Sequence, residues 1–152
     1  MAKRILIING HPIKDSFNDA LAKSYLEGAR KTRHEIEELK LSSYDFDPVL
    51  RDTTHEKDSS KKVVSEWQQK VQEANHLVII YPTWWSTVPA LLKGFFDKVF
   101  SAGFAFRFIE GNPLPKKLLK GKTARIITPM DAPPIFYRLM LRNAGIYVLK
   151  KG

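Results

Sequence analysis

The chain has 152 residues and no cysteine, and its 25 Lys and Arg against 16 Asp and Glu give a formal charge of +9 at pH 7. This length suits one domain with one hydrophobic core, and the lack of cysteine excludes disulfides, thiolate metal sites and cysteine nucleophiles. No apolar run approaches the roughly 20 residues that span a bilayer, and the apolar run at 5–8 is too short for a signal peptide, so we expect a cytosolic protein. The positive charge is spread along the chain, which fits either an anionic partner or an ordinary solvated surface.

The first predicted element is a strand at residues 5–8, where four apolar residues follow one another. Such a run is typical of a strand buried on both faces of a parallel sheet. Residues 16–31 predict a helix that is capped by its first four residues and has apolar side chains at helical spacing. Residues 35–41 predict a more polar strand at or near the sheet edge, and we expect 42–55 to be irregular.

A second helix is predicted to run to about residue 74, and an all-apolar strand follows it at 77–81. The expected helix cap is Asp58, Ser59 and Ser60, and the expected buried stripe is Val63, Val64, Trp67, Val71 and Ala74. Pro89 suits the first turn of a third helix, which we expect to run to about residue 100.

The segment 101–120 is expected to be long and irregular, with a Phe-rich patch. Within it Phe104, Phe106 and Phe108 alternate like half of a hairpin, and packing in the core or at an interface is the default interpretation. A third apolar strand is predicted at 124–128, followed by a helix over 135–143.

The alternation of strands and helices predicts a parallel α/β sheet with right-handed crossovers. Ligands of such sheets bind beyond the carboxyl ends of the strands. The loops that could carry chemistry are therefore 9–17, 82–88 and 129–134.

The first of these loops joins a buried strand to the start of a helix. Exposed backbone N–H groups and the positive end of the helix dipole favour a phosphate there, and His11, Ser16 and Asn18 add side-chain donors. The loop lacks the G-x-G-x-x-G pattern of dinucleotide sites. An ordinary strand–helix turn with a capped helix therefore stays open as the alternative.

The second loop carries two adjacent tryptophans, Trp84 and Trp85, just beyond a strand. Two such side chains are hard to bury together, so at least one is expected to face a pocket for a flat heteroaromatic ligand. Packing under the Phe-rich segment, or at a subunit interface, is the alternative. The third loop, 128–134, is proline-rich and leads into a helix that carries Tyr137, so it could close the same crevice.

Several other patterns do not amount to sites. Residues 121–123 (Gly-Lys-Thr) look like the end of a P-loop, but that motif needs glycine where Lys116 stands, and the segment precedes a strand. The four histidines lie more than twenty residues apart, without the spacing of zinc ligands. No G-x-S-x-G elbow of a serine hydrolase is present.

Taken together, the loops resemble the flavodoxin-2-type NAD(P)H dehydrogenases (quinone), a group that includes azoreductases and drug-modulator quinone reductases. The matching segments are 7–12, 16–18, 81–85 and, most specific, 89–100 with 103–106. The resemblance implies one flavin-binding domain over 1–152, a flavodoxin-like three-layer sandwich with a parallel sheet in the order 2-1-3-4. Residues 148–152 end the chain too early for the fold's usual fifth strand and last helix, so we expect the fifth strand to be missing.

The resemblance also implies roles for single residues. Those that would hold the flavin phosphate and ribityl chain are His11, Ser16, Phe17 and Asn18. Those that would line the isoalloxazine edge, largely through backbone groups, are Pro82, Thr83, Trp84, Trp85 and Ser86. Those that would close the pyrimidine side of the ring are Thr128, Pro129, Met130 and Asp131, in place of the Gly-Gly turn of many quinone reductases. Tyr137 would lie near the hydride-accepting face as the catalytic residue.

The activity implied is transfer of hydride from NAD(P)H through bound FMN or FAD to a quinone or similar acceptor. Family members are usually homodimers with active sites at the subunit interface, which would place the Phe-rich patch near that interface. We expect no metal, no nucleic-acid partner and no integral membrane segment. A regulatory binding subunit of a potassium-efflux system is the main alternative, and a one-electron carrier ranks last because true flavodoxins are typically acidic.

Overall fold

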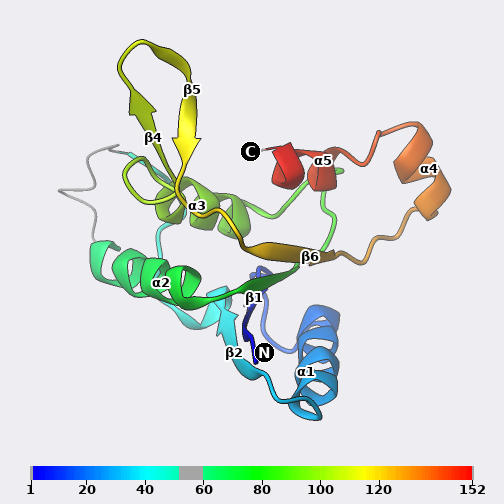
Figure 1. The fold of residues 1–152 in the computed structure, drawn as a ribbon. Coiled ribbons are helices and arrows are strands. Elements are labelled where there is room, and N and C mark those ends of the chain that lie inside the picture. The colour runs from blue at the N-terminus through cyan, green and yellow to red at the C-terminus, as the bar shows by residue number, and fades with distance from the viewer. Residues whose placement is uncertain (1, 52–59, 152) are drawn as a thin grey trace.

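The computed structural model describes residues 2–51 and 60–151 (Figure 1). In chain order the elements are β1 (Arg4–Asn9), α1 (Phe17–Arg30), β2 (Glu35–Lys40), η1 (Leu41–Ser43), α2 (Lys61–Glu73), β3 (His76–Ile80), α3 (Ala90–Val99), β4 (Phe106–Ile109), β5 (Asn112–Lys117), β6 (Thr123–Ile127), α4 (Pro134–Leu139) and α5 (Ala144–Lys151). Among these described residues, no helix is both long enough and apolar enough to cross a membrane.

The main sheet is parallel and has the strand order β2-β1-β3-β6. Its two central strands, β1 and β3, pair from Ile5 with His76 through Asn9 with Ile80. Since β6 is the fourth parallel strand along the chain, the predicted order 2-1-3-4 is confirmed. The more polar β2 is an edge strand of this sheet, also as predicted.

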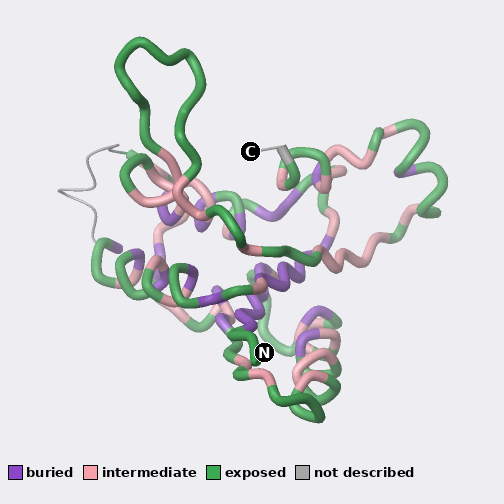
Figure 2. The backbone as a smooth tube through the Cα atoms, in the orientation of Figure 1, coloured by how far each residue is buried: buried purple, intermediate pink, exposed green. Residues whose placement is uncertain are grey.

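Helices cover the sheet on both faces and make it the middle of three layers (Figures 1 and 2). On one face, α1 packs through Ala22 against Ile5, Ile7, Val78 and Ile80. On the other, α2 and α3 pack against Leu6, Ile8, Leu77 and Ile79 in the larger of the two buried clusters. The predicted flavodoxin-like sandwich is thus confirmed, and burial on both faces explains the continuously apolar strands.

Trp67 is the largest fully buried side chain of this larger cluster. Its ring lies 4.7 Å from that of Phe46 and 5.4 Å from that of Phe95, centroid to centroid. It therefore joins α2 to α3 and to the segment after η1. The expected buried stripe of α2 is confirmed at Val64, Trp67, Val71 and Ala74, while Val63 is only partly buried.

The cap of α2 differs from the prediction. Asp58 and Ser59 lie outside the described residues, and Ser60 is the N-cap residue without a side-chain cap hydrogen bond. The Ser60 hydroxyl instead accepts a hydrogen bond from the Asp47 amide at 3.4 Å. Contact with a distant loop has replaced the local cap.

The expectation of an irregular segment over 101–120 was wrong, because β4 and β5 form an antiparallel hairpin there. Gly111, in the two-residue connection, has a φ of +75°, which glycine adopts without steric cost. The hairpin projects from the sandwich (Figure 1), and most of its residues are exposed (Figure 2). Of the three alternating phenylalanines, Phe106 and Phe108 lie in β4, whereas Phe104 precedes it and packs against the core, as the default interpretation expected.

The predicted helix over 135–143 is shorter than expected. It ends at Leu139, and the chain reverses at Arg142 and Asn143, whose φ values are +48° and +52°. A further helix, α5, follows and leads back toward the sandwich. Likewise, the start of the expected irregular segment 42–55 belongs to the short 3-10 helix η1.

Candidate functional site

The three predicted loops lie together beyond the carboxyl ends of the central strands. The Thr83 hydroxyl is 2.7 Å from the Thr128 hydroxyl, and the Thr83 amide donates to the Pro129 carbonyl at 2.9 Å. The rings of His11 and Trp84 meet edge to face at 5.4 Å between centroids. Residues of all three loops are thereby brought into one place by the parallel sheet.

The first loop is held by a network around Asp19. One carboxylate oxygen accepts from the Asn9 side-chain amide at 2.7 Å, and the other accepts from the Ser16 backbone amide at 3.0 Å. The Ser16 hydroxyl accepts in turn from the Asp19 amide, which completes a capping box at the start of α1. Lys40 adds an ion pair at 2.9 Å. This network fixes the helix end that faces the site.

Asn9 and Asp19 were not among the predicted site residues. The Ser-x-x-Asp pattern at 16–19 is a capping-box signature and could have identified Asp19. The contact with Asn9 spans a strand end and a helix, so no local pattern indicates it. Gly10 is confined as well, because a Cβ there would lie 2.9 Å from Leu92 side-chain atoms, and this glycine lets α3 approach the loop.

We expect the charge of Asp19 to stabilise the protein above its pKa and not below it. Burial would raise the pKa of Asp19, but hydrogen bonds from Lys40 and Ser16, the Lys40 charge and the Asn9 amide together lower it. A lowered folded-state pKa gives stability that is present above the unfolded pKa and is lost as pH falls through the folded one. Asp19→Asn should therefore lower the free energy of unfolding by about 1 kcal/mol at pH 7.

This difference between wild type and Asp19→Asn should be smaller at pH 3 than at pH 7, because pH 3 lies below the unfolded pKa of about 3.9, as measured by urea unfolding at both pH values. Glu27→Gln on the exposed side of α1 is the matched control and should show little difference at either pH. An undiminished difference at pH 3 would show that the Asp19 charge is not the cause.

Asn18 is 2 % exposed, and its side-chain nitrogen has no hydrogen-bond partner among the described residues. A buried amide without a partner costs free energy, and in native proteins such a group calls for an explanation such as a bound ligand. Ile13 within the loop and Phe17 at its end are exposed although both are apolar. The loop thus combines a buried amide donor that has no partner among the described residues with exposed apolar side chains.

The second loop is a tight turn with a strained backbone. Trp84 and Thr87 exchange two backbone hydrogen bonds, of 3.1 and 3.0 Å. The residues between them, Trp85 and Ser86, have φ values of +49° and +64°. Positive φ at both central positions is the condition for a type I′ turn, which Asn and Gly adopt readily and tryptophan does not.

This turn exposes the Trp85 side chain, which is 99 % accessible to solvent. Trp84 is also exposed, and its ring contacts His11. Neither tryptophan is buried in the core, and whether they face a flat ligand or a second subunit stays a prediction. Pro82 is buried beneath them, and Thr83 is partly buried.

The third loop and α4 are placed against the back of this turn. Thr128, Pro129 and Met130 are partly buried and Asp131 is exposed. Tyr137 is 2 % exposed, and its hydroxyl donates to the Ser86 carbonyl and accepts from the Gly145 amide. Its predicted place near the hydride-accepting face stays a prediction.

Tyr81, at the end of β3, is fully buried below these loops. Burial, with the neighbouring Tyr137, raises the pKa of Tyr81 to about 12. Its phenol therefore stays neutral and un-ionised across the physiological range, which suits a structural role under the site.

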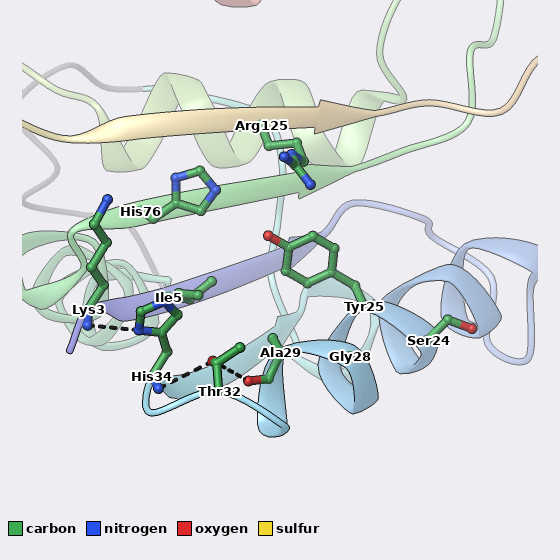
Figure 3. A pocket seen from close by; sticks show the side chains of 10 residues that line it. All are labelled: Lys3, Ile5, Ser24, Tyr25, Gly28, Ala29, Thr32, His34, His76 and Arg125. Atoms are coloured by element: carbon green, nitrogen blue, oxygen red, sulfur yellow. Dashed lines mark hydrogen bonds between the residues drawn. The ribbon is translucent and has the colours of Figure 1, made fainter. Parts of the chain in front are cut away.

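A hollow of about 520 Å³ lies elsewhere, and none of the predicted site residues lines it (Figure 3). It opens near the amino ends of β1 and β3, between α1 and β6, with Lys3, His76 and Arg125 in its wall. Burial, then the charges of Arg125 and Lys3, lower the pKa of His76. This hollow is separate from the loops at the carboxyl ends of the strands.

Comparison with known proteins places the chain in a family with a flavodoxin-like fold. The Flavodoxin_2 family, described as having a flavodoxin-like fold, matches residues 3–146. The chain is 33% identical to the NAD(P)H dehydrogenase [quinone] 1 of Cavia porcellus over 70% of its own length and 46% of that protein. It is 32% identical to the ribosyldihydronicotinamide dehydrogenase [quinone] of Mus musculus, over 83% of this chain and 67% of that one.

Among solved structures, Smu.1420 from Streptococcus mutans UA159 superposes with a TM-score of 0.74 at 36% identity, covering 88% of this chain and 71% of that chain. The chain spans about half the length of the Cavia porcellus relative. These similarities fix the family and the fold, and they leave the activity of the whole protein to be tested.

Proposed function

This chain belongs to the Flavodoxin_2 family, and we propose that it is a flavin-dependent oxidoreductase passing hydride from NAD(P)H to a quinone or similar aromatic acceptor. The names of the relatives support this reaction class. The observation that carries the proposal for this chain is the buried, unpartnered amide of Asn18 at a capped helix end, close to a turn that exposes Trp85. A phosphate and a flat ring system are the groups that such a pair suits.

The cofactor would be FMN or FAD, and its isoalloxazine ring would supply the hydride-transfer chemistry. The residues that would hold its phosphate and ribityl chain are His11, Ser16, Phe17 and Asn18. Those that would line the ring are Pro82, Thr83, Trp84, Trp85 and Ser86 on one side and Thr128, Pro129, Met130 and Asp131 on the other. The amide of Asn18 would gain its missing hydrogen-bond partner from the bound cofactor. This unpartnered donor is the feature of the structure that fits a flavin phosphate.

The part played by the chain itself is to bind and to orient. The capping box keeps the amino end of α1 rigid, so its dipole and free amides can face an anion without rearrangement. The Ile13 amide donates to His11 Nδ1 at 3.0 Å and so fixes the ring that contacts Trp84. Nicotinamide and acceptor would use the same open face in turn.

The test is the absorbance spectrum of the purified protein, followed by oxidation of NADH and NADPH with menadione after loading with FMN or FAD. We expect a yellow protein, release of the flavin on denaturation, and turnover with at least one nicotinamide. If the loaded protein binds flavin but does not turn over, the regulatory binding subunit becomes the better assignment. If neither flavin binds, the proposal is wrong for this chain.

We further propose that the protein is a homodimer and that the hairpin β4–β5 lies at its interface. An isolated two-stranded hairpin is marginally stable in water, yet this one projects with Phe108 at 71 % and Leu114 at 72 % exposure. Exposed apolar side chains on a projecting element are typical of an interaction surface.

We expect Phe108→Ala and Leu114→Ala each to raise the dimer dissociation constant about tenfold, the usual effect of removing an apolar anchor. Sedimentation velocity over a range of concentrations measures this constant. Lys116→Ala, on the same hairpin and equally exposed, is the control and should change it little. A monomer at all concentrations, or equal effects of the three variants, would contradict the proposal.

A further inference from the structure

The turn that carries Trp85 is supported by residues of α4 and of the start of α5. The Ser86 carbonyl accepts two hydrogen bonds there, from the Gly145 amide at 3.1 Å and from the Tyr137 hydroxyl at 3.2 Å. The Gly145 amide also donates to the Tyr137 hydroxyl at 2.9 Å. These three groups form a closed triangle, in which the hydroxyl of Tyr137 both donates and accepts.

Two members of the triangle are buried, and the third, Ser86, is partly buried. Tyr137 is 2 % exposed, and Gly145 is buried as well. A Cβ at Gly145 would lie 3.1 Å from the Cα of Thr87 and 3.1 Å from the hydroxyl of Tyr137. A side chain at Gly145 would therefore fit only if these neighbours moved apart by a few tenths of an ångström. Leaving the hydrogen bonds of the triangle's two buried members unmade would cost free energy.

The same contacts join two strained stretches of backbone. Trp85 and Ser86 have positive φ in the turn, and Arg142 and Asn143 have positive φ where the chain reverses to bring Gly145 back. Non-glycine residues hold such conformations only when the surrounding structure compels them, and they gather at sites that must be pre-organised. Four of the five non-glycine residues with positive φ in the described chain belong to this one arrangement.

We infer that Tyr137 is a positioning residue, which together with Gly145 holds the Ser86 carbonyl and so keeps the strained turn in the form that presents Trp85 to a planar ligand. Its hydroxyl is committed to two protein partners and acts through Ser86. The part of this inference that concerns flavin rests on the proposed function. The part that concerns the turn does not, and the two can be tested separately.

The test uses the full chain labelled with 5-fluorotryptophan, which gives one ¹⁹F signal for each of Trp67, Trp84 and Trp85. Trp84→Phe and Trp85→Phe assign the two exposed signals. In Tyr137→Phe, without flavin, we expect the Trp85 signal to shift or broaden because the turn samples other conformations, while the Trp67 signal stays in place. Trp67 lies in the core between α2 and α3, so it reports any general loss of structure.

Tyr147→Phe is the matched control, since it removes one hydroxyl from an exposed tyrosine of α5 and should move none of the signals. Gly145→Ala should move the same Trp85 signal as Tyr137→Phe by crowding the triangle from the other side. If neither variant folds, hydrogen exchange of the Gly145 amide in the wild-type protein is measured instead. We expect this amide to exchange slowly, and fast exchange would overturn the inference.

Flavin titration of the same proteins completes the experiment. We expect Tyr137→Phe to weaken flavin binding about three- to tenfold while the pH profile of turnover keeps its shape. If the Trp85 signal does not move in Tyr137→Phe, the positioning role is wrong. If turnover is also abolished in that variant, Tyr137 instead acts directly in catalysis. A moved signal in a protein whose wild type binds no flavin would leave the positioning role intact and reject the proposed function.

Discussion

Replacing Asn18 with leucine should raise the dissociation constant for FMN or FAD by about 10- to 100-fold while leaving the unliganded protein as stable as the wild type or slightly more so. The amide nitrogen of Asn18 is buried without a partner among the described residues. A hydrogen bond from this group to a charged phosphate is worth about 1.5–3 kcal/mol, which the leucine cannot make. Leucine has nearly the same shape and removes an unpaired donor, so the free protein loses nothing.

The prediction is specific because Asn18→Leu should weaken flavin binding without lowering the stability of the free protein. Flavin fluorescence titration gives the dissociation constant, and urea unfolding without flavin gives the stability. Ala20→Leu, on the exposed side of the same helix, is the control for the added apolar bulk and should leave both measurements near wild type. If Asn18→Leu destabilises the free protein by several kcal/mol, the amide has a structural partner and is no ligand donor.

Replacing Trp85 with glycine should weaken flavin binding about tenfold or more and stabilise the free protein by about 1 kcal/mol. Stacking of a flat heterocycle on an aromatic side chain is worth about 1–3 kcal/mol, as alanine substitutions at nucleobase sites show. At a φ of +49°, a side chain with a Cβ costs about 1–2 kcal/mol relative to glycine, part of which is offset by the greater freedom of glycine in the unfolded chain.

Trp85→Ala separates these two contributions, because it removes the indole but keeps the Cβ. We expect it to weaken flavin binding as much as Trp85→Gly does, without the gain in stability. The side chain is almost fully exposed, so its loss leaves no cavity in either variant. Equal thermal midpoints for the glycine and alanine variants would show that the turn is not strained by its side chain.

The fold could be predicted to a large extent because its signals are local. Continuous apolar runs mark the strands β1 and β3, and helical spacing marks α1 and α2, with a correct capping pattern at α1 alone. The strand order followed from the resemblance, and the sheet confirms it. The hairpin β4–β5 was missed because its strands are exposed on both faces, so burial does not impose the usual pattern of a strand.

The candidate site was predictable as a set of loops but not as a geometry. Beyond the ends of parallel strands, the positions of loops follow from the topology, and residues such as His11, Ser16 and Trp84 were named on that basis. The link from Asn9 to Asp19 and the triangle of Tyr137, Ser86 and Gly145 join segments that are far apart or unrelated in pattern. Their residues carry no spacing that would indicate such contacts.

By itself, then, the sequence determined the alternation of strands and helices, the capped amino end of α1 and the place of the loops, because these depend on neighbouring residues. Only the tertiary structure decided that Trp85 is fully exposed, that Asn18 is buried with an unused donor and that Tyr137 supports the turn. The left-handed backbone at Trp85 and Ser86 is held by hydrogen bonds to Ser86 from Tyr137 of α4 and Gly145 of α5. The turn contains no glycine, so the sequence gives no local signal of its left-handed backbone.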